Sequence, residues 1–139
     1  MTVTKFNHIG HCVTNVERSR KFYEQALGFK YDRELTVEGE GPSKLLRVKL
    51  PLKLHAVYLV REGFTLELLY YPQPGAAPRR ERAMNEPGLT HISLNVRDMK
   101  ATLTKVKELG GQILSDTDVG AAIFVKDPDG QLIELIQER

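Results

Sequence analysis

The clearest structural signal in the sequence is Thr90-His91-Ile92-Ser93-Leu94-Asn95-Val96-Arg97-Asp98. It follows a Pro87-Gly88 break, and its apolar and polar residues alternate with the two-residue period of a strand. The apolar face carries Ile92, Leu94 and Val96, and the polar face carries His91, Ser93 and Asn95. Asp98 is a good N-cap for a following helix. The stretch therefore predicts a half-buried strand that leads into a helix.

The same pattern occurs 83 residues earlier, in Asn7-His8-Ile9-Gly10-His11-Cys12-Val13-Thr14-Asn15. The matched pairs are His8 with His91, Ile9 with Ile92, Val13 with Val96, and Asn15 with Asp98. Leu66-Glu67-Leu68-Leu69 likewise matches Ile133-Glu134-Leu135-Ile136, at an offset of 67 residues. The sequence thus predicts two copies of one module, of which the first is longer by about sixteen residues between the matched ends.

The predicted organisation is one domain, residues 1–139, built from module 1 (about 1–71), a proline- and glycine-rich linker (72–88) and module 2 (about 89–139). Periodicity and turn residues predict two helices, at 15–27 and 98–109. They predict strands at 5–13, 29–37, 44–50, 54–60 and 64–71 in module 1, and at 91–96, 112–116, 121–126 and 131–137 in module 2. Residues 38–43 read as a polar turn or mobile loop.

Composition excludes several classes of protein. The 139 residues are 41% hydrophobic and 27% charged, with a net charge of +2, so neither a nucleic-acid surface nor a nucleic-acid partner is expected. No apolar run is long enough for a membrane span or resembles a signal peptide. The single cysteine, Cys12, excludes an internal disulfide and fits a reducing compartment. We therefore expect a cytoplasmic protein with no membrane partner.

Each module supplies a histidine at the start of its first strand and a glutamate in its last strand. Alternation places these side chains opposite the aliphatic face, so packing of the modules as pseudo-symmetric copies would let all four converge in one cleft. The four are His8, Glu67, His91 and Glu134. Two imidazoles and two carboxylates suit one divalent ion of Ni, Zn, Co, Mn or Fe, and leave a coordination position open for substrate.

The same parity predicts the residues that face the substrate, which are Gly10, Cys12, Leu69, Tyr71, Ser93 and Asn95. Gly10 would leave room beside His8, and Ser93 and Asn95 could orient a polar group. His11 falls on the opposite face, beneath the helix, and is expected to be structural.

The chain resembles the vicinal oxygen chelate superfamily of glyoxalase I, methylmalonyl-CoA epimerase, extradiol dioxygenases, and fosfomycin and bleomycin resistance proteins. The matching motifs are His8-Ile9-Gly10, Phe22-Tyr23 through Leu27-Gly28-Phe29, Leu66-Glu67-Leu68, His91-Ile92, and Asp127-Pro128-Asp129-Gly130 through Ile133-Glu134-Leu135. The resemblance implies an α+β fold of two tandem βαβββ modules, whose curled mixed sheets enclose a metal cleft.

The resemblance also implies a reaction. His-Glu-His-Glu is the metal set of bacterial-type glyoxalase I, a lyase that removes a proton next to a carbonyl through a metal-stabilised enediolate. By that resemblance Glu134 is the proton-shuttling base and Glu67 the opposing carboxylate, and both are catalytic. We therefore predict a divalent-metal-dependent lyase or isomerase that acts on a small-molecule carbonyl substrate.

That substrate is not expected to be the usual glutathione hemithioacetal. The glutathione-dependent enzymes carry an arginine four residues after the first histidine and an asparagine four residues after the first glutamate. Here the two positions hold Cys12 and Tyr71, and neither can pair with a carboxylate as a guanidinium does.

Four alternatives stay open. An extradiol dioxygenase-like enzyme would use only three ligands, so Glu67 counts against it. An acyl-CoA epimerase-like enzyme normally has glutamine at that position and needs another carboxylate near the middle strands. A metal-free binding or drug-resistance module has no need for two buried carboxylates. Thiol transfer to an epoxide would need a three-ligand site and a potassium loop. The repeat also leads us to expect a homodimer, with the site formed within one chain or across a swapped pair.

Overall fold

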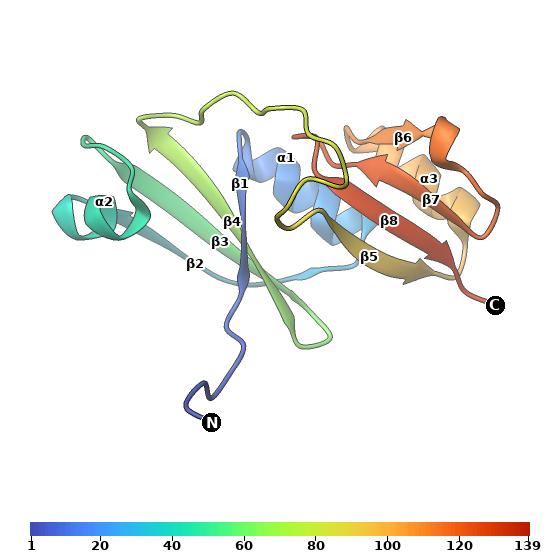
Figure 1. Ribbon diagram of the computed structural model, residues 1–139, viewed down its shortest axis with the longest axis horizontal. Coiled ribbons are helices and arrows are strands. Elements are labelled where there is room, and N and C mark those ends of the chain that lie inside the picture. Colours follow the sequence, from blue (N-terminus) through green and yellow to red (C-terminus); the bar gives the residue numbers. More distant parts are fainter. The chain divides into compact units, whose positions relative to one another are not determined.

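The computed structural model describes residues 1–139 and contains two compact units. Unit 1 consists of Met1–Val16 and Gly28–Ala77, and unit 2 consists of Glu17–Leu27 and Pro78–Arg139. Each unit is built on one four-stranded mixed sheet with few helices, which confirms the α+β class (Figure 1). None of the helices has the length and apolar character that a membrane span requires.

The sheet of unit 1 has the order β1-β4-β3-β2. Its strands are β1 (Ile9–Val13), β2 (Lys30–Glu38), β3 (Lys53–Arg61) and β4 (Phe64–Gln73). β1 runs parallel to β4, and the other neighbours are antiparallel. The β3–β4 hairpin turns on Glu62 and Gly63, both with positive φ (49° and 80°), as a tight two-residue turn requires. One face of the sheet buries Val57, Leu59, Leu66 and Leu68 almost completely.

The sheet of unit 2 repeats this topology with the order β5-β8-β7-β6. Its strands are β5 (His91–Val96), β6 (Gln112–Leu114), β7 (Ala122–Lys126) and β8 (Leu132–Gln137). β5 is parallel to β8, as β1 is to β4. Helix α3 (Met99–Glu108) lies behind β6 and β7 in Figure 1. It begins at Asp98, whose Oδ1 accepts a 3.0 Å hydrogen bond from the Ala101 amide, so the predicted N-cap is confirmed.

The first helix is shorter in α form than predicted. α1 covers Val16–Lys21, and a wider π-helical turn, η1 (Phe22–Ala26), follows it. The rings of Phe22 and Tyr23 are fully buried and meet edge to face, with centroids 5.3 Å apart. Tyr23 donates a 2.8 Å hydrogen bond to Asp127, in the turn before β8, so this segment is anchored within unit 2.

The predicted strand at 44–50 and the predicted loop at 38–43 are both wrong. β2 continues to Glu38, and a helix, α2 (Glu40–Leu46), occupies the region (Figure 1). The Gly41-Pro42 pair suggested a loop, but Pro42 lies in the first turn of the helix. Backbone N–H groups in the first turn make no hydrogen bond within the helix, so the lack of an N–H on proline costs nothing there. Leu46 and the following Val48 then pack on an apolar cluster of the sheet.

Two further differences remain, one in each module. The strand predicted at 5–13 begins only at Ile9, so His8 lies just before β1 and not within it. The second difference lies in module 2. The strand predicted at 112–116 stops at Leu114, and a 3-10 turn, η2 (Ser115–Thr117), takes its place. Thr117 accounts for the stop, because its hydroxyl donates to the Leu114 carbonyl and accepts from the Phe124 amide. The side chain thereby replaces a ladder hydrogen bond.

Candidate metal-binding site

The first half-site lies in unit 1. His8 directly precedes β1, and Glu67 lies in the neighbouring strand β4, so Nε2 of His8 comes within 3.1 Å of Oε1 of Glu67. Nδ1 of His8 lies 2.6 Å from Oδ1 of Asn7. Because a carbonyl oxygen only accepts, Nδ1 is the donor in this contact, and Nε2 is the ring nitrogen that faces the carboxylate. A proton or a metal ion between Nε2 and Oε1 would satisfy both atoms at this distance.

Glu67 is held by its neighbours on both sides of β4. Across the β3–β4 pair, Tyr58 lies opposite Glu67 and donates a 2.7 Å hydrogen bond to its Oε2. On the other side, Gly10 of β1 is the parallel partner of Glu67. A Cβ at Gly10 would lie 3.0 Å from Cδ1 of Leu69 and 3.7 Å from Oε1 of Glu67, so glycine leaves room for both side chains. The ring of His8 meets that of Tyr58 edge to face, 5.6 Å apart.

Two tyrosines on this face have raised pKa values. Burial, followed by the hydrogen bond to Glu67 and its charge, raises the pKa of Tyr58, although the nearby Arg33 opposes the shift. Burial, with smaller contributions from Cys12 and Glu67, raises the pKa of Tyr71. Both phenols therefore stay protonated in the neutral range, and Tyr58 remains a hydrogen-bond donor to Glu67.

The second half-site lies in unit 2 and has the same plan. Nε2 of His91 lies 3.7 Å from Oε1 of Glu134, and Nδ1 of His91 lies 2.7 Å from Oγ1 of Thr90. Ser93, the β5 partner of Glu134, donates a 2.8 Å hydrogen bond to Oε1 of Glu134. Phe124 lies opposite Glu134 on β7, and its ring meets that of His91 edge to face at 5.1 Å.

The two half-sites differ in how firmly each carboxylate is held. Tyr58 and Phe124 are equivalent in register, and so are Gly10 and Ser93. Glu67 receives its hydroxyl from a large buried tyrosine, and its side chain is 12% exposed. Glu134 receives its hydroxyl from a small serine, and its side chain is 28% exposed. Glu134 therefore has more freedom to move than Glu67.

The chemistry of each pair fits half of a divalent-metal site. Ligand atoms bonded at about 2.1 Å, with angles near those of tetrahedral or octahedral ions, lie roughly 3.0–3.4 Å apart. The His8–Glu67 separation falls in this range, and the His91–Glu134 separation is slightly longer. In both pairs a polar partner occupies Nδ1, the usual support for a ligating histidine. Neither unit by itself brings together three or more side chains that could hold an ion.

The predicted substrate-facing residues have different surroundings. Gly10, Cys12 and Asn95 are exposed on their strands, and Ser93 is bonded to Glu134. Leu69 and Tyr71 are half-buried and pack against an apolar cluster of Leu52, Leu54, Ala56 and Tyr58. Leu35, Val37, Leu46 and Val48 pack against the same cluster. The face that carries Glu67 is thus apolar over much of its area.

The other two histidines lie outside these pairs. His11 is buried with Val13, in agreement with the parity that assigned it a structural place. His55 on β3 forms its own pair with Glu34, 2.8 Å from Nε2 to Oε2, and Nδ1 lies 3.1 Å from Thr36. That pair is one position out of phase with Ala56 and Tyr58, so it occupies the opposite face of the sheet from Glu67.

Sequence reasoning missed Tyr58 and Arg33. The guanidinium carbon of Arg33, on β2, lies 3.9 Å from the centroid of the Tyr58 ring. Tyr58 could have been found from the sequence, because a two-residue hairpin turn at Glu62-Gly63 places residue 58 opposite residue 67 on the neighbouring strand. The pairing of β2 with β3 has a register irregularity between Tyr31 and Arg33, and no sequence pattern predicts it. The face on which Arg33 lies could therefore not be predicted.

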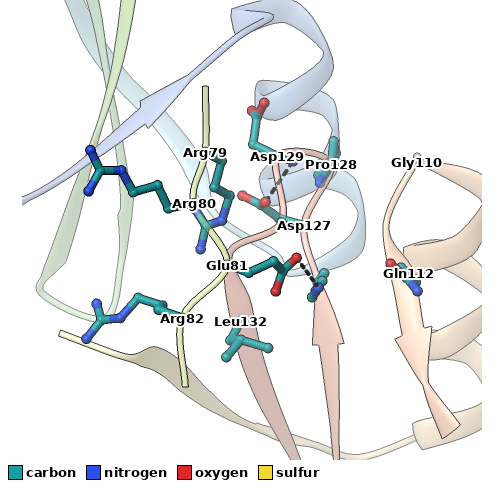
Figure 2. A pocket seen from close by; sticks show the side chains of 12 residues that line it. Arg79, Arg80, Glu81, Arg82, Gly110, Gln112, Asp127, Pro128, Asp129 and Leu132 are labelled. Atoms are coloured by element: carbon teal, nitrogen blue, oxygen red, sulfur yellow. Dashed lines mark hydrogen bonds and ion pairs between the residues drawn. The ribbon is translucent and has the colours of Figure 1, made fainter. Parts of the chain in front are cut away.

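A cavity of about 280 Å³ lies in unit 2, between the linker residues 79–82 and the Asp127–Gly130 turn (Figure 2). Most of its charges are already engaged: Lys126 pairs with Glu81 at 3.6 Å, and Asp129 pairs with Arg18 at 3.4 Å. Figure 2 shows the side chains of Arg80 and Arg82 directed away from Asp127 and Asp129. The Lys126–Glu81 pair joins residue 81 of the linker to β7.

Comparison with known proteins identifies the family. The model of the Glyoxalase/Bleomycin resistance protein/Dioxygenase superfamily matches residues 5–135. The chain belongs to this superfamily. A lactoylglutathione lyase from Pseudomonas putida is 30% identical over 95% of the chain and 84% of its own length.

Two solved structures show how far the superfamily fold extends. A glyoxalase family protein from Bacillus cereus superposes with a TM-score of 0.82 at 15% identity, covering 99% of this chain and 96% of that one. The fosfomycin resistance protein FosX from Listeria monocytogenes, solved with Mn(II) and sulfate, gives a TM-score of 0.64 at 16% identity and covers 99% and 95%. These likenesses confirm the tandem-module fold.

Proposed function

We propose that the chain is a divalent-metal-dependent lyase or isomerase of the glyoxalase type, which removes and returns a proton next to a carbonyl group. The observation that carries the proposal is the repeated pair: a histidine that presents Nε2 to a glutamate, with Nδ1 held by the residue before it, once in each unit. The similarity to a lactoylglutathione lyase supports the same class of reaction.

In this proposal His8, Glu67, His91 and Glu134 together hold one ion, within one chain or across a homodimer. An ion of Ni, Zn, Co, Mn or Fe would suit this donor set and would supply the Lewis acidity that stabilises negative charge on two neighbouring substrate oxygens. Asn7 and Thr90 orient the two rings, and Tyr58 fixes Glu67.

Glu134 is the proposed proton carrier. A base must change its position or its partner during the reaction, and the more exposed carboxylate with the smaller donor can do so more easily. It would take the proton from the carbon next to the carbonyl and return it to the neighbouring carbon for an isomerisation, while Glu67 stays in place.

The proposed substrate is a small carbonyl compound other than the glutathione hemithioacetal. Cys12 and Tyr71 offer no guanidinium or amide at the positions that the resemblance assigns to glutathione binding. The apolar cluster beside Glu67 favours a substrate with a hydrocarbon part.

The test is proton exchange in D₂O with protein reloaded with Ni²⁺, Co²⁺, Mn²⁺ or Zn²⁺. Methylglyoxal–thiol adducts and acyl-CoA thioesters are incubated with it, and deuterium at the carbon next to the carbonyl is followed by NMR. The proposal expects exchange that Glu134→Gln abolishes and that His55→Ala, a control on the opposite face, leaves unchanged. A protein that takes up no metal and catalyses no exchange would instead be a binding module.

A further inference from the structure

The most unusual group on the face that carries Glu67 is the guanidinium of Arg33. It lies 3.9 Å above the Tyr58 ring, and the hydroxyl of the same tyrosine bonds to Glu67. Arg33 and Tyr58 are direct cross-strand partners on β2 and β3. A positive charge is thus held next to one half of the proposed metal site by a residue that also contacts that half-site.

The guanidinium of Arg33 is positioned on the Tyr58 ring and is only weakly paired with an acidic side chain. Stacking on the ring and a side-chain hydrogen bond with Tyr58 restrain the guanidinium, and its five N–H donors leave others for a second partner. Its acidic partner is the adjacent Asp32, whose Oδ2 lies 3.9 Å from Nε of Arg33. The Arg33 side chain remains 55% exposed. An arginine in this state can still form a two-point contact with a planar anion.

The surroundings narrow the class of anion. Leu35 and Val37 follow Arg33 on the same face of β2, and they pack on the apolar cluster that includes Tyr58. One cation beside an apolar surface matches a ligand with a single negative charge on a hydrocarbon chain. A phosphate dianion would need more than one cation to balance its charge. The favoured group is therefore a carboxylate.

We infer that Arg33, held on the ring of Tyr58, binds a carboxylate of the substrate and so selects anionic carbonyl compounds. This inference rests on the proposed function, since it places the substrate at the His8–Glu67 half-site. Arg33 replaces, from a different strand, the cationic contact that Cys12 cannot make. Tyr58 acts as a positioning residue, and the two parts of its side chain have separate tasks: the ring holds Arg33 and the hydroxyl holds Glu67.

The test uses binding and needs no known substrate. Monohydroxamates of malonic, succinic and glutaric acid present two neighbouring oxygens for a metal and a carboxylate at increasing reach, and their methyl esters are neutral controls of similar size. Each compound is titrated calorimetrically into Ni²⁺-loaded protein of measured metal content. At least one acid is expected to bind about tenfold or more tightly than its ester, as one charge-assisted contact of about 1.4 kcal/mol or more would give.

Variants assign that preference to Arg33. Arg33→Gln should bring the affinity of the acid down to that of its ester, whereas Lys30→Gln, which removes a charge from the same strand, should keep the preference. Tyr58→Phe keeps the ring and should keep the preference, and Tyr58→Leu should reduce it. Equal binding of acid and ester by metal-loaded wild type, or a preference that survives Arg33→Gln, overturns the inference alone. Failure to take up metal overturns the proposed function and this inference with it.

Discussion

The Tyr58 hydroxyl donates a 2.7 Å hydrogen bond to Oε2 of Glu67, whereas the residue equivalent to Tyr58 in unit 2 is Phe124, which has no hydroxyl to give. Glu134 instead accepts a hydrogen bond from Ser93, on the strand at its other side. The hydroxyl donor therefore comes from the antiparallel neighbour strand in one half-site and from the parallel neighbour strand in the other. This difference leaves Glu67 fixed and Glu134 freer to move.

Removal of the hydroxyl from Tyr58 should destabilise the protein. Tyr58→Phe leaves a buried carboxylate oxygen without its donor, which typically costs about 1–3 kcal/mol of the free energy of unfolding. Urea denaturation at neutral pH measures the loss. Tyr31→Phe is the control, because the Tyr31–Glu34 hydrogen bond is solvent-exposed. Equal stability of wild type and Tyr58→Phe would show that Glu67 does not depend on Tyr58.

Addition of a hydroxyl to Phe124 should slow the reaction. Phe124→Tyr gives Glu134 a second donor, as Tyr58 is for Glu67, and a base so held must break an extra charge-assisted bond to move. We expect proton exchange to fall about tenfold or more while the metal content stays near that of wild type. Faster or unchanged exchange would contradict the assignment of Glu134 as the mobile carboxylate.

Thr90 should matter to metal binding although it is not a proposed ligand. Thr90→Val keeps the shape of the side chain but removes the hydroxyl that lies 2.7 Å from Nδ1 of His91. Loss of such support typically weakens metal affinity about 10–100-fold, and competition with a chromophoric chelator measures it. Thr104→Val on α3 is the control, since that hydroxyl bonds only to the Lys100 carbonyl. An affinity unchanged by Thr90→Val would remove the support assigned to this residue.

Tyr23 should make stability depend on alkaline pH. Burial, followed by the charge of Asp127 and the hydrogen bond to it, raises the pKa of Tyr23 well above its usual value. The unfolded chain loses this proton at about pH 10, before the folded chain does, so the contribution is complete below that pH and is lost as the pH rises toward the folded pKa. Tyr23→Phe should therefore flatten the decline of the unfolding free energy above about pH 10. Urea unfolding at a series of pH values shows whether the slope changes.

Much of the fold could be predicted from the sequence because the matched segments of the repeat are strands with one buried face. The alternation around His8 and His91, and that around Glu67 and Glu134, fixed the face of each side chain, since a strand has only two. The structure accordingly brings His8 to Glu67 and His91 to Glu134. Their role as ligands of one ion stays a prediction.

The features that sequence reasoning missed depend on register and on competition between local signals. Tyr58 and Phe124 act through cross-strand positions, and Arg33 follows a local irregularity in the β2–β3 pairing. Helix α2 was missed because Pro42 reads as a breaker everywhere except in a first helical turn. Packing of Leu46 and Val48 on the sheet decides that segment, and packing is not visible in a local pattern.

The metal stoichiometry of the protein tests most directly whether the two pairs share one ion. The protein is purified without tags or chelators and reloaded with Ni²⁺, Co²⁺, Mn²⁺ or Zn²⁺, and its metal content is measured by elemental mass spectrometry. We predict about one ion per chain, lost in both His8→Ala and His91→Ala and retained in His55→Ala. Two ions per chain, each lost in only one variant, would contradict a site shared by the two pairs. No ion in the wild type would contradict a metal site altogether.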